Sequence, residues 1–322
     1  MDDSFETVKD RAFEGSDYEE DVTLGDILIT LAVILVIGIF IVLIAVIAAK
    51  VRKAKLNKRM NGVNYFRDAP NGGNLNATHR LGLCSELCKE DTLLGAYLLR
   101  LISQGCLEST EESPDAETVM LRLCRAPHSG NEYDDTLYTI LEAAAGADGV
   151  LQPLELEQFC ERNDTPLIRF MDSCERNGLQ TLIRGGCLKG ALCENIKSLT
   201  KKGQQELDEV LGLKRFLLDF SLIQERGVKE TVIWQDYMVY ALLLGIADKL
   251  APQIRELYPE AIPQLDQYQR YINYTGYYNS LMYGAYRRER QRREAARNRG
   301  SGGRASFGGG GGFSGGGRGG IR

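Results

Sequence analysis

The segment from Ile27 to Ala49 constrains this 322-residue chain more than any other part of it. It carries no charged residue, and its only hydroxyl belongs to Thr30. At about 1.5 Å per helical residue, a helix of this length crosses the roughly 30 Å hydrocarbon core of a bilayer. A core helix of a soluble protein would normally show a polar face. The segment therefore predicts a transmembrane helix, with the lipid bilayer as a partner.

A cleaved signal peptide is the alternative interpretation of this segment. Such a peptide begins with basic residues, and its apolar region is only about 7–15 residues long. Here residues 1–26 are acidic instead, because aspartate and glutamate far outnumber Lys9 and Arg11. We therefore expect the segment to be retained as an anchor.

Basic residues follow the apolar segment directly, and no acidic residue occurs between Ala49 and Asp68. Basic residues near the end of a membrane helix are retained on the cytoplasmic side. The sequence thus predicts a single-pass protein of the plasma (inner) membrane, with the N-terminus outside and the rest of the chain after Lys50 in the cytoplasm. The same cluster is expected to contact anionic lipid headgroups, at about 1 kcal/mol per residue. Its members are Lys50, Arg52, Lys53, Lys55, Lys58 and Arg59.

The eight cysteines follow no regular disulfide spacing, and the chain is too long to need disulfide staples. They predict reduced, buried thiols in a reducing compartment such as the cytosol. A redox pair is the alternative for Cys187 and Cys193, which flank LKGAL, and for Cys106 and Cys124, which face each other across an expected hairpin. No CxxC motif supports either pair.

Residues 78–126 follow the order helix, helix, hairpin. Apolar residues recur at helical spacing in TLLGAYLLRLISQGCLE, with Asp91 as a candidate N-cap and Gly105 at the expected helix end. A polar turn, EESPDAE, then precedes TVMLRL, which alternates as a strand does. This order is typical of a small winged-helix module, although architecture alone does not imply nucleic-acid binding.

Helical patterns continue over residues 132–257. In SLTKKGQQELDEVLGLKRFLLDFSLI we expect an amphipathic helix, a break at Gly212 and a second helix. YALLLGIA is too short for a second membrane span, because Asp236 and Asp248 bracket it. It predicts a buried core helix, in which Trp234 also packs.

Tyrosines and then arginines dominate residues 258–299. The arginines predict a solvated helix face with Glu289 and Glu294 as ion-pair partners. Contact with lipid phosphates or RNA is the alternative, although the single RGG, at Arg318, gives RNA little support. The candidate phosphate-contact residues are Arg287, Arg288, Arg290, Arg292 and Arg293.

The predicted fold is mainly α, with a small α+β winged-helix-like unit, one transmembrane helix and a disordered glycine-rich tail. The predicted segments are an acidic extracytoplasmic N-terminus (1–26), the transmembrane helix (27–49), a basic juxtamembrane segment and linker (50–77), the winged-helix-like unit (78–126), a helical domain (132–257), the Tyr-rich then Arg-rich segment (258–299) and the tail (300–322).

Three stretches together resemble the domain of unknown function 2207 family of predicted bacterial membrane proteins. The first is the apolar span with its basic flank, YFRDAP and LLGAYLLRLISQGCLE; the second is SLTKKGQQELDEVLGLKRFLLDF followed by VIWQDYMVYALLLGIADKL; the third is GGGGGFSGGGRGG. The resemblance covers residues 27–251 and the tail, with a looser match between 132 and 193. Family members usually carry a β-rich extracytoplasmic domain and further spans, which this sequence replaces with residues 1–26 and a tyrosine-rich stretch. The resemblance implies a membrane topology and no activity.

His79, Cys84 and Cys88 form the sharpest candidate metal site. The two cysteines, at i and i+4, would share one helix face, but His79 would lie about 140° away from it on a continuous helix, and a fourth ligand is missing. We therefore predict no metal site. ADGVLQPLELE begins like a calcium loop but lacks the alternating oxygen ligands, so Asp148 is expected in a turn.

Neither a phosphate-binding glycine loop nor a GxSxG motif occurs. The sequence predicts a non-enzymatic, membrane-anchored interaction or regulatory module with an unknown protein partner and no cofactor. The alternative is a membrane-tethered nucleic-acid-binding protein that uses the winged-helix-like unit and the arginine cluster. An enzyme with an unfamiliar site is the third hypothesis.

Overall fold

The computed structural model describes residues 24–110, 120–162, 164–219, 231–250 and 262–301. Most of the acidic N-terminus and most of the glycine-rich tail lie outside these ranges, so the predictions for them stay predictions. The chain divides into two compact units, residues 1–57 and 58–322.

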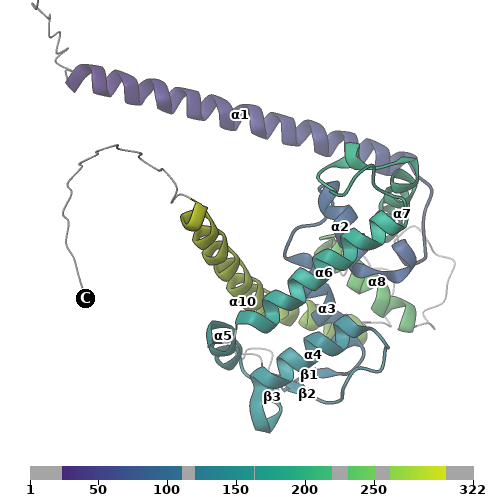
Figure 1. Ribbon diagram of the computed structural model, residues 1–322. Coiled ribbons are helices and arrows are strands. Elements are labelled where there is room, and N and C mark those ends of the chain that lie inside the picture. Colours follow the sequence, from purple (N-terminus) through teal and green to yellow (C-terminus); the bar gives the residue numbers. More distant parts are fainter. Residues whose placement is uncertain (1–23, 111–119, 163, 220–230, 251–261, 302–322) are drawn as a thin grey trace, which may run out of the picture. The chain divides into compact units, whose positions relative to one another are not determined.

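The first unit contains most of the long helix α1 (Leu24–Gly62; Figure 1). Within the described ranges, one helix is long and apolar enough to cross a membrane, and it covers Leu31–Gly62. Its apolar side chains are exposed, as surface that meets lipid must be; Leu35 is 65% exposed. The predicted apolar helix is therefore confirmed. The helix also continues through the basic segment, where alanine, lysine, arginine and leucine all favour helix.

The second unit begins with the last turn of α1. An extended segment follows, then a short 3-10 turn (Pro70–Gly73) and α2 (Leu75–Cys84). Asn74 starts α2, because its side chain accepts a hydrogen bond from the Ala77 amide at 2.9 Å.

Helix α3 (Thr92–Ser103) lies in the core of the second unit, and most of its residues are buried. It packs against α8 (Thr231–Leu243) and α10 (Ile262–Ser301). Asp91 occupies the N-cap position as predicted, but its carboxylate makes no capping hydrogen bond. Gly105, at φ +69°, follows the helix end and turns the chain into the first strand.

A small antiparallel sheet follows α3. Its strands β1 (Leu107–Ser109), β2 (Leu121–Leu123) and β3 (Val150–Leu151) pair in that order. The predicted hairpin between β1 and β2 is confirmed, whereas β3 was not predicted. A hydrogen bond links helix α10 to strand β3: the Tyr278 hydroxyl donates to the Leu151 carbonyl at 2.7 Å.

Three further helices confirm the patterns between residues 132 and 184. They are α4 (Glu132–Ala145), α5 (Pro153–Arg162) and α6 (Asp164–Arg184). Asp148 lies in a turn as expected, where its carboxylate accepts from the Val150 amide at 3.1 Å. Helix α6 contains Gly178 at its contact with α2. A Cβ at this position would lie only 2.3 Å from the Asn76 carbonyl oxygen of α2. The absence of a side chain thus permits the close packing of α2 on α6.

A buried ion pair joins α3 to α4. The Arg100 Nε donates to Asp134 Oδ1 at 2.8 Å, and Ser129 donates to the other carboxylate oxygen at 2.7 Å. The Asp134 side chain is fully buried, and that of Arg100 is 15% exposed. The Arg100 guanidinium also lies 4.7 Å from the centre of the Tyr97 ring.

The remaining helices correct one prediction and confirm another. Helix α7 (Lys201–Leu218) runs unbroken through Gly212, so the predicted break there is wrong. Helix α8 is a buried core helix as predicted, with Met238, Val239 and Ala241 inside. Trp234 belongs to α8, but its side chain lies outside the described part of the structure. The Tyr-rich and Arg-rich stretches form one helix, α10.

Candidate functional site

The chain that follows the apolar helix is bound along α7 and α8. We call this region the junction, and define it as residues 58–69 together with the residues of α7 and α8 that contact them. All of it belongs to the second unit.

Arg59 opens the junction. Its Nε donates to Asp208 Oδ1 at 2.7 Å, and a terminal nitrogen donates to the Gln204 carbonyl at 3.0 Å. The sequence predicted Arg59 as a lipid contact, whereas the structure engages it with α7 and leaves its side chain 26% exposed. The other five candidate lipid-contact residues, Lys50, Arg52, Lys53, Lys55 and Lys58, are exposed.

Arg215 of α7 also binds the end of α1. Its Nη1 donates to the carbonyls of Asn61 and Val63 at 3.0 and 2.7 Å. Such carbonyls have no partner within their own helix, and a cation near them also complements the helix dipole. Arg215 therefore acts as a C-terminal cap supplied from a distant helix.

Aromatic rings fill the centre of the junction. Phe216 makes edge-to-face contacts with Tyr65 and Tyr237, at 6.2 and 5.5 Å between ring centres. The guanidinium of Arg67 lies 5.5 Å from the Phe216 ring centre, and the Arg67 carbonyl accepts from the Tyr237 hydroxyl at 3.1 Å. The Tyr65 hydroxyl in turn donates to Asp219 at 3.0 Å. Phe216 is only 4% exposed, so its ring is shielded from water, whereas Tyr65 at the rim of the cluster is 40% exposed.

Gly212 does not interrupt α7; it serves the packing of the extended segment against this helix. A Cβ at this residue would lie 2.5 Å from the Asn64 carbonyl oxygen and 3.0 Å from the Phe66 Cβ. The glycine therefore admits the backbone of the extended segment against the helix. An isolated glycine inside a helical pattern commonly has such a packing reason, which is the signal that could have located the junction.

The α7 and α8 residues of the junction fall within residues 178–254, which match the family model described as predicted membrane protein (DUF2207) C-terminal domain. The chain carries a DUF2207 C-terminal domain. The family resemblance is thus confirmed over these residues. No curated protein matches the chain, and no solved structure does. In this chain, the DUF2207 segment provides the surface on which residues 58–69 lie.

The candidate metal ligands take up different positions from those predicted. Helix α2 ends at Cys84, and Glu86 then adopts φ +60°, so Cys88 does not share a helix face with Cys84; that prediction is wrong. His79 is buried with Nε2 2.8 Å from the Lys89 carbonyl, and burial lowers its pKa to about 4. It is therefore neutral at pH 7 and donates from Nε2. Among the described residues, no three His, Cys, Asp or Glu side chains form a metal-binding group.

All eight cysteines are free thiols, and only Cys124 is exposed. Cys106 and Cys124 are neighbours through their backbones, because the Cys124 amide donates to the Cys106 carbonyl at 2.9 Å. Their thiols, however, point to different acceptors: the Cys106 thiol donates to Gln104 and the Cys124 thiol to the Arg122 carbonyl. The structure instead places Cys193 against Cys84.

The arginines at the end of α10 are largely paired with glutamates. Arg290 contacts Glu294 and Glu175 at 3.2 and 3.4 Å, and Glu289 holds both Arg293 and Arg292. The ion-pair partners are therefore the predicted ones, with Glu175 in addition. Arg287 and Arg288 are exposed.

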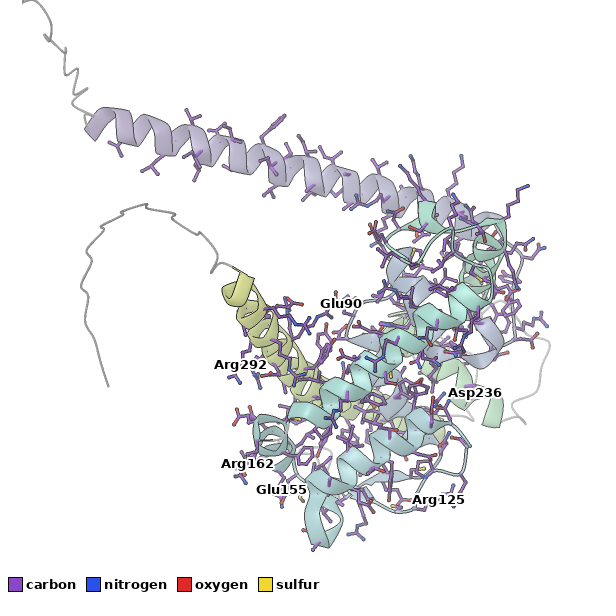
Figure 2. All side chains as sticks on the ribbon, in the orientation of Figure 1. Glu90, Arg125, Glu155, Arg162, Asp236 and Arg292 are labelled. Atoms are coloured by element: carbon purple, nitrogen blue, oxygen red, sulfur yellow. The ribbon has the colours of Figure 1, made fainter. Side chains whose placement is uncertain are left out.

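A cavity of about 310 Å³ lies beside these arginines, where α10 packs on α5. It is lined by Cys160, Glu161, Ala285, Arg288, Glu289 and Arg292. Figure 2 shows Arg292 on α10 at the edge of the unit, and its side chain is 77% exposed. Because two carboxylates face two guanidinium groups, the cavity offers an anion no strong net attraction.

Proposed function

We propose that this protein is a membrane-anchored, non-enzymatic interaction or regulatory module whose helical domain faces the cytoplasm. The observation that supports the proposal is the junction. A tether that only keeps a domain near a membrane can be a flexible linker without contacts of its own. Here the residues after the anchor are bound by charged hydrogen bonds and an aromatic cluster of the DUF2207 domain. Such a bound segment is an element that a protein partner can hold or release.

The partner hypothesis is tested by purifying the full chain from solubilised membranes after crosslinking in cells. Arg215→Ala removes both hydrogen bonds to the Asn61 and Val63 carbonyls. Arg292→Ala serves as the matched control, since Arg292 lies outside the junction and is an exposed arginine with a long, 3.7 Å contact to Glu289. We expect a specific protein to co-purify with the wild type and the control, and its yield to change with Arg215→Ala. Recovery of no specific protein with any of the three chains contradicts the proposal.

The proposed orientation rests on the basic residues after the apolar segment. It is tested with single cysteines introduced at Ser4 or Ser314, in a Cys124→Ser background that removes the one exposed native thiol. An impermeant maleimide applied to intact cells is expected to label the cysteine at position 4 alone. Labelling at position 314 would place the domain on the other side of the membrane and would end the cytoplasmic proposal.

We also propose that the exposed basic residues of α1 contact anionic lipid headgroups. The full chain in nanodiscs of neutral lipid and of mixed anionic lipid is treated with an amine-reactive reagent, and labelling of Lys50, Lys53, Lys55 and Lys58 is compared. Lysines near phosphate are expected to be protected in the anionic discs. Lys201, at the start of α7, serves as the reference lysine. Equal protection in both lipids contradicts the contact.

The winged-helix-like interpretation of residues 78–126 stays a prediction. Helix α3, which would be its recognition helix, is buried along most of its length against α8 and α10, so it offers little surface to a groove. The arginines of α10 are engaged by glutamates. These observations favour a role for the unit in the core over nucleic-acid binding. Salt-dependent binding of the full chain to DNA or RNA would reverse that preference.

A further inference from the structure

A loop of the DUF2207 domain, residues 187–200, buries a thiol at its tip. The base of the loop is closed by hydrogen bonds from Lys189 to Ser198 and from Thr200 to Cys187, both at 2.9 Å between the amide nitrogen and the carbonyl oxygen. Residues 190–195 are otherwise exposed, and even Leu192 is 59% exposed. Cys193 is only 4% exposed. The loop therefore exposes its leucine and turns its cysteine inward.

Cys193 meets two side chains of α2. The Cys84 thiol, at the end of that helix, lies close enough to the Cys193 thiol to interact with it. Arg80, one turn earlier, donates to the Cys193 carbonyl at 3.2 Å. The Arg80 Nε is buried and has no hydrogen-bond partner within the described ranges. The Arg80 guanidinium charge thus acts on both of these neighbouring thiols.

This arrangement favours a thiolate at Cys193. The interaction with Cys84 and the charge of Arg80 lower the pKa of the Cys193 thiol, whereas the same interaction and burial raise the pKa of the Cys84 thiol. The pair therefore divides into a nucleophile and a proton-bearing neighbour, as reactive cysteine pairs do. A disulfide between them requires the two sulfur atoms to approach to about 2.05 Å.

We propose that Cys84 and Cys193 form a redox-sensitive pair that hydrogen peroxide converts to a disulfide. The Cys193 thiolate attacks one peroxide oxygen, an S–O bond forms, the O–O bond breaks, and the released oxygen leaves as water with the proton of the Cys193 thiol and the one it already carried. The Cys84 sulfur then attacks the Cys193 sulfenic acid, forming the S–S bond and releasing the second water. Two thiols are oxidised, and one peroxide is reduced to two waters. Cytosolic disulfides are usually transient and redox-sensing, and cellular thiols reverse such a bond by exchange.

The disulfide would fasten the loop to α2 just before α7 begins. The loop and α7 are in close contact, because a Cβ at Gly203 of α7 would lie 2.1 Å from the Cys187 carbonyl oxygen of the loop. Oxidation therefore acts on the element that leads directly into the helix of the junction.

The test uses the reduced full chain in detergent, treated with hydrogen peroxide, blocked with iodoacetamide and digested with trypsin without reduction. We expect the loss of the free thiols of Cys84 and Cys193, in addition to any oxidation of the exposed Cys124, and a crosslink between the peptides LGLCSELCK and GALCENIK. Because the first peptide holds both Cys84 and Cys88, two variants decide between them. Cys84→Ser is expected to abolish the crosslink and leave a sulfenic acid on Cys193 that dimedone traps, whereas Cys88→Ser is expected to retain the crosslink.

Arg80→Gln provides a second test that leaves both thiols in place. It is expected to slow oxidation of the pair while the oxidation rate of Cys124 stays the same. Oxidation confined to Cys124, a crosslink that depends on Cys88, or an Arg80→Gln rate equal to that of the wild type each overturns the proposal.

Discussion

Replacing Gly212 by alanine tests the junction most directly. The new methyl group would lie 2.5 Å from the Asn64 carbonyl oxygen, and ordinary van der Waals contact begins at 3.4 Å. The extended segment must therefore retreat by about 0.9 Å, or the helix must shift. Overpacking of this kind typically costs about 1–3 kcal/mol. Alanine also favours helix over glycine by about 1 kcal/mol, which partly offsets that cost.

Gly276→Ala is the matched control. Gly276 lies inside α10, and a Cβ there meets nothing within 4 Å. The gain in helix propensity is common to both variants, so the difference between them isolates the clash. We expect Gly212→Ala to be less stable than Gly276→Ala by about 1–3 kcal/mol. At about 2–4 °C per kcal/mol, the midpoints of thermal unfolding should separate clearly.

Hydrogen exchange of the full chain in detergent locates the effect. In Gly212→Ala, we expect faster exchange of amides in residues 63–69 and unchanged exchange in β1 and β2, which lie away from the clash. If the two glycine variants unfold at the same temperature and exchange alike, the close approach at Gly212 does not hold the junction together, and the reasoning is refuted.

Three further predictions concern the second unit. Arg100→Ala leaves the buried Asp134 carboxylate without its cation and should destabilise the unit by about 3–5 kcal/mol in chemical denaturation; a paired Arg100→Met, Asp134→Leu variant should recover most of this loss. His79 has a pKa of about 4 in the folded chain against its ordinary pKa of 6.5, so its contribution to stability is complete above pH 6.5 and is lost as the pH falls towards 4. That loss should reach roughly 3 kcal/mol, and His79→Gln should flatten the pH dependence of unfolding in this window, whereas an unchanged slope would exclude His79 as its source. Arg290→Ala should cost less than about 1 kcal/mol, because its side chain and those of its glutamate partners are 40–59% exposed; a larger loss in the same denaturation assay would show that the end of α10 is held by more than these pairs.

The elements that the sequence predicted correctly are those whose signal is local. The apolar run of α1, the helical spacing of α3 before Gly105 and the proline at the start of α5 all act within one or two turns of the chain. Asp148 likewise makes its turn with a residue two positions away.

The parts that the sequence did not predict depend on distant partners. Gly212 suggested a break, because nothing in its own helix shows that Asn64 will lie against it. The strand β3 contains two residues and exists only because β2 is already beside it. Arg215 resembles any basic residue of an amphipathic helix until the carbonyls of Asn61 and Val63 are placed before it. For the same reason, spacing suggested Cys187 as the neighbour of Cys193, whereas the fold provides Cys84.

The burial of α3 by α10 has a consequence for synthesis of the chain. The core helix leaves the ribosome roughly 160 residues before the helix that covers it. At about 5–20 residues per second, this gap lasts on the order of ten to thirty seconds. The apolar helix α1 is also made before α10, so α3 still lacks its cover when α1 has already left the ribosome. The nascent chain must therefore keep the apolar surface of α3 from aggregating until its C-terminal part has been made.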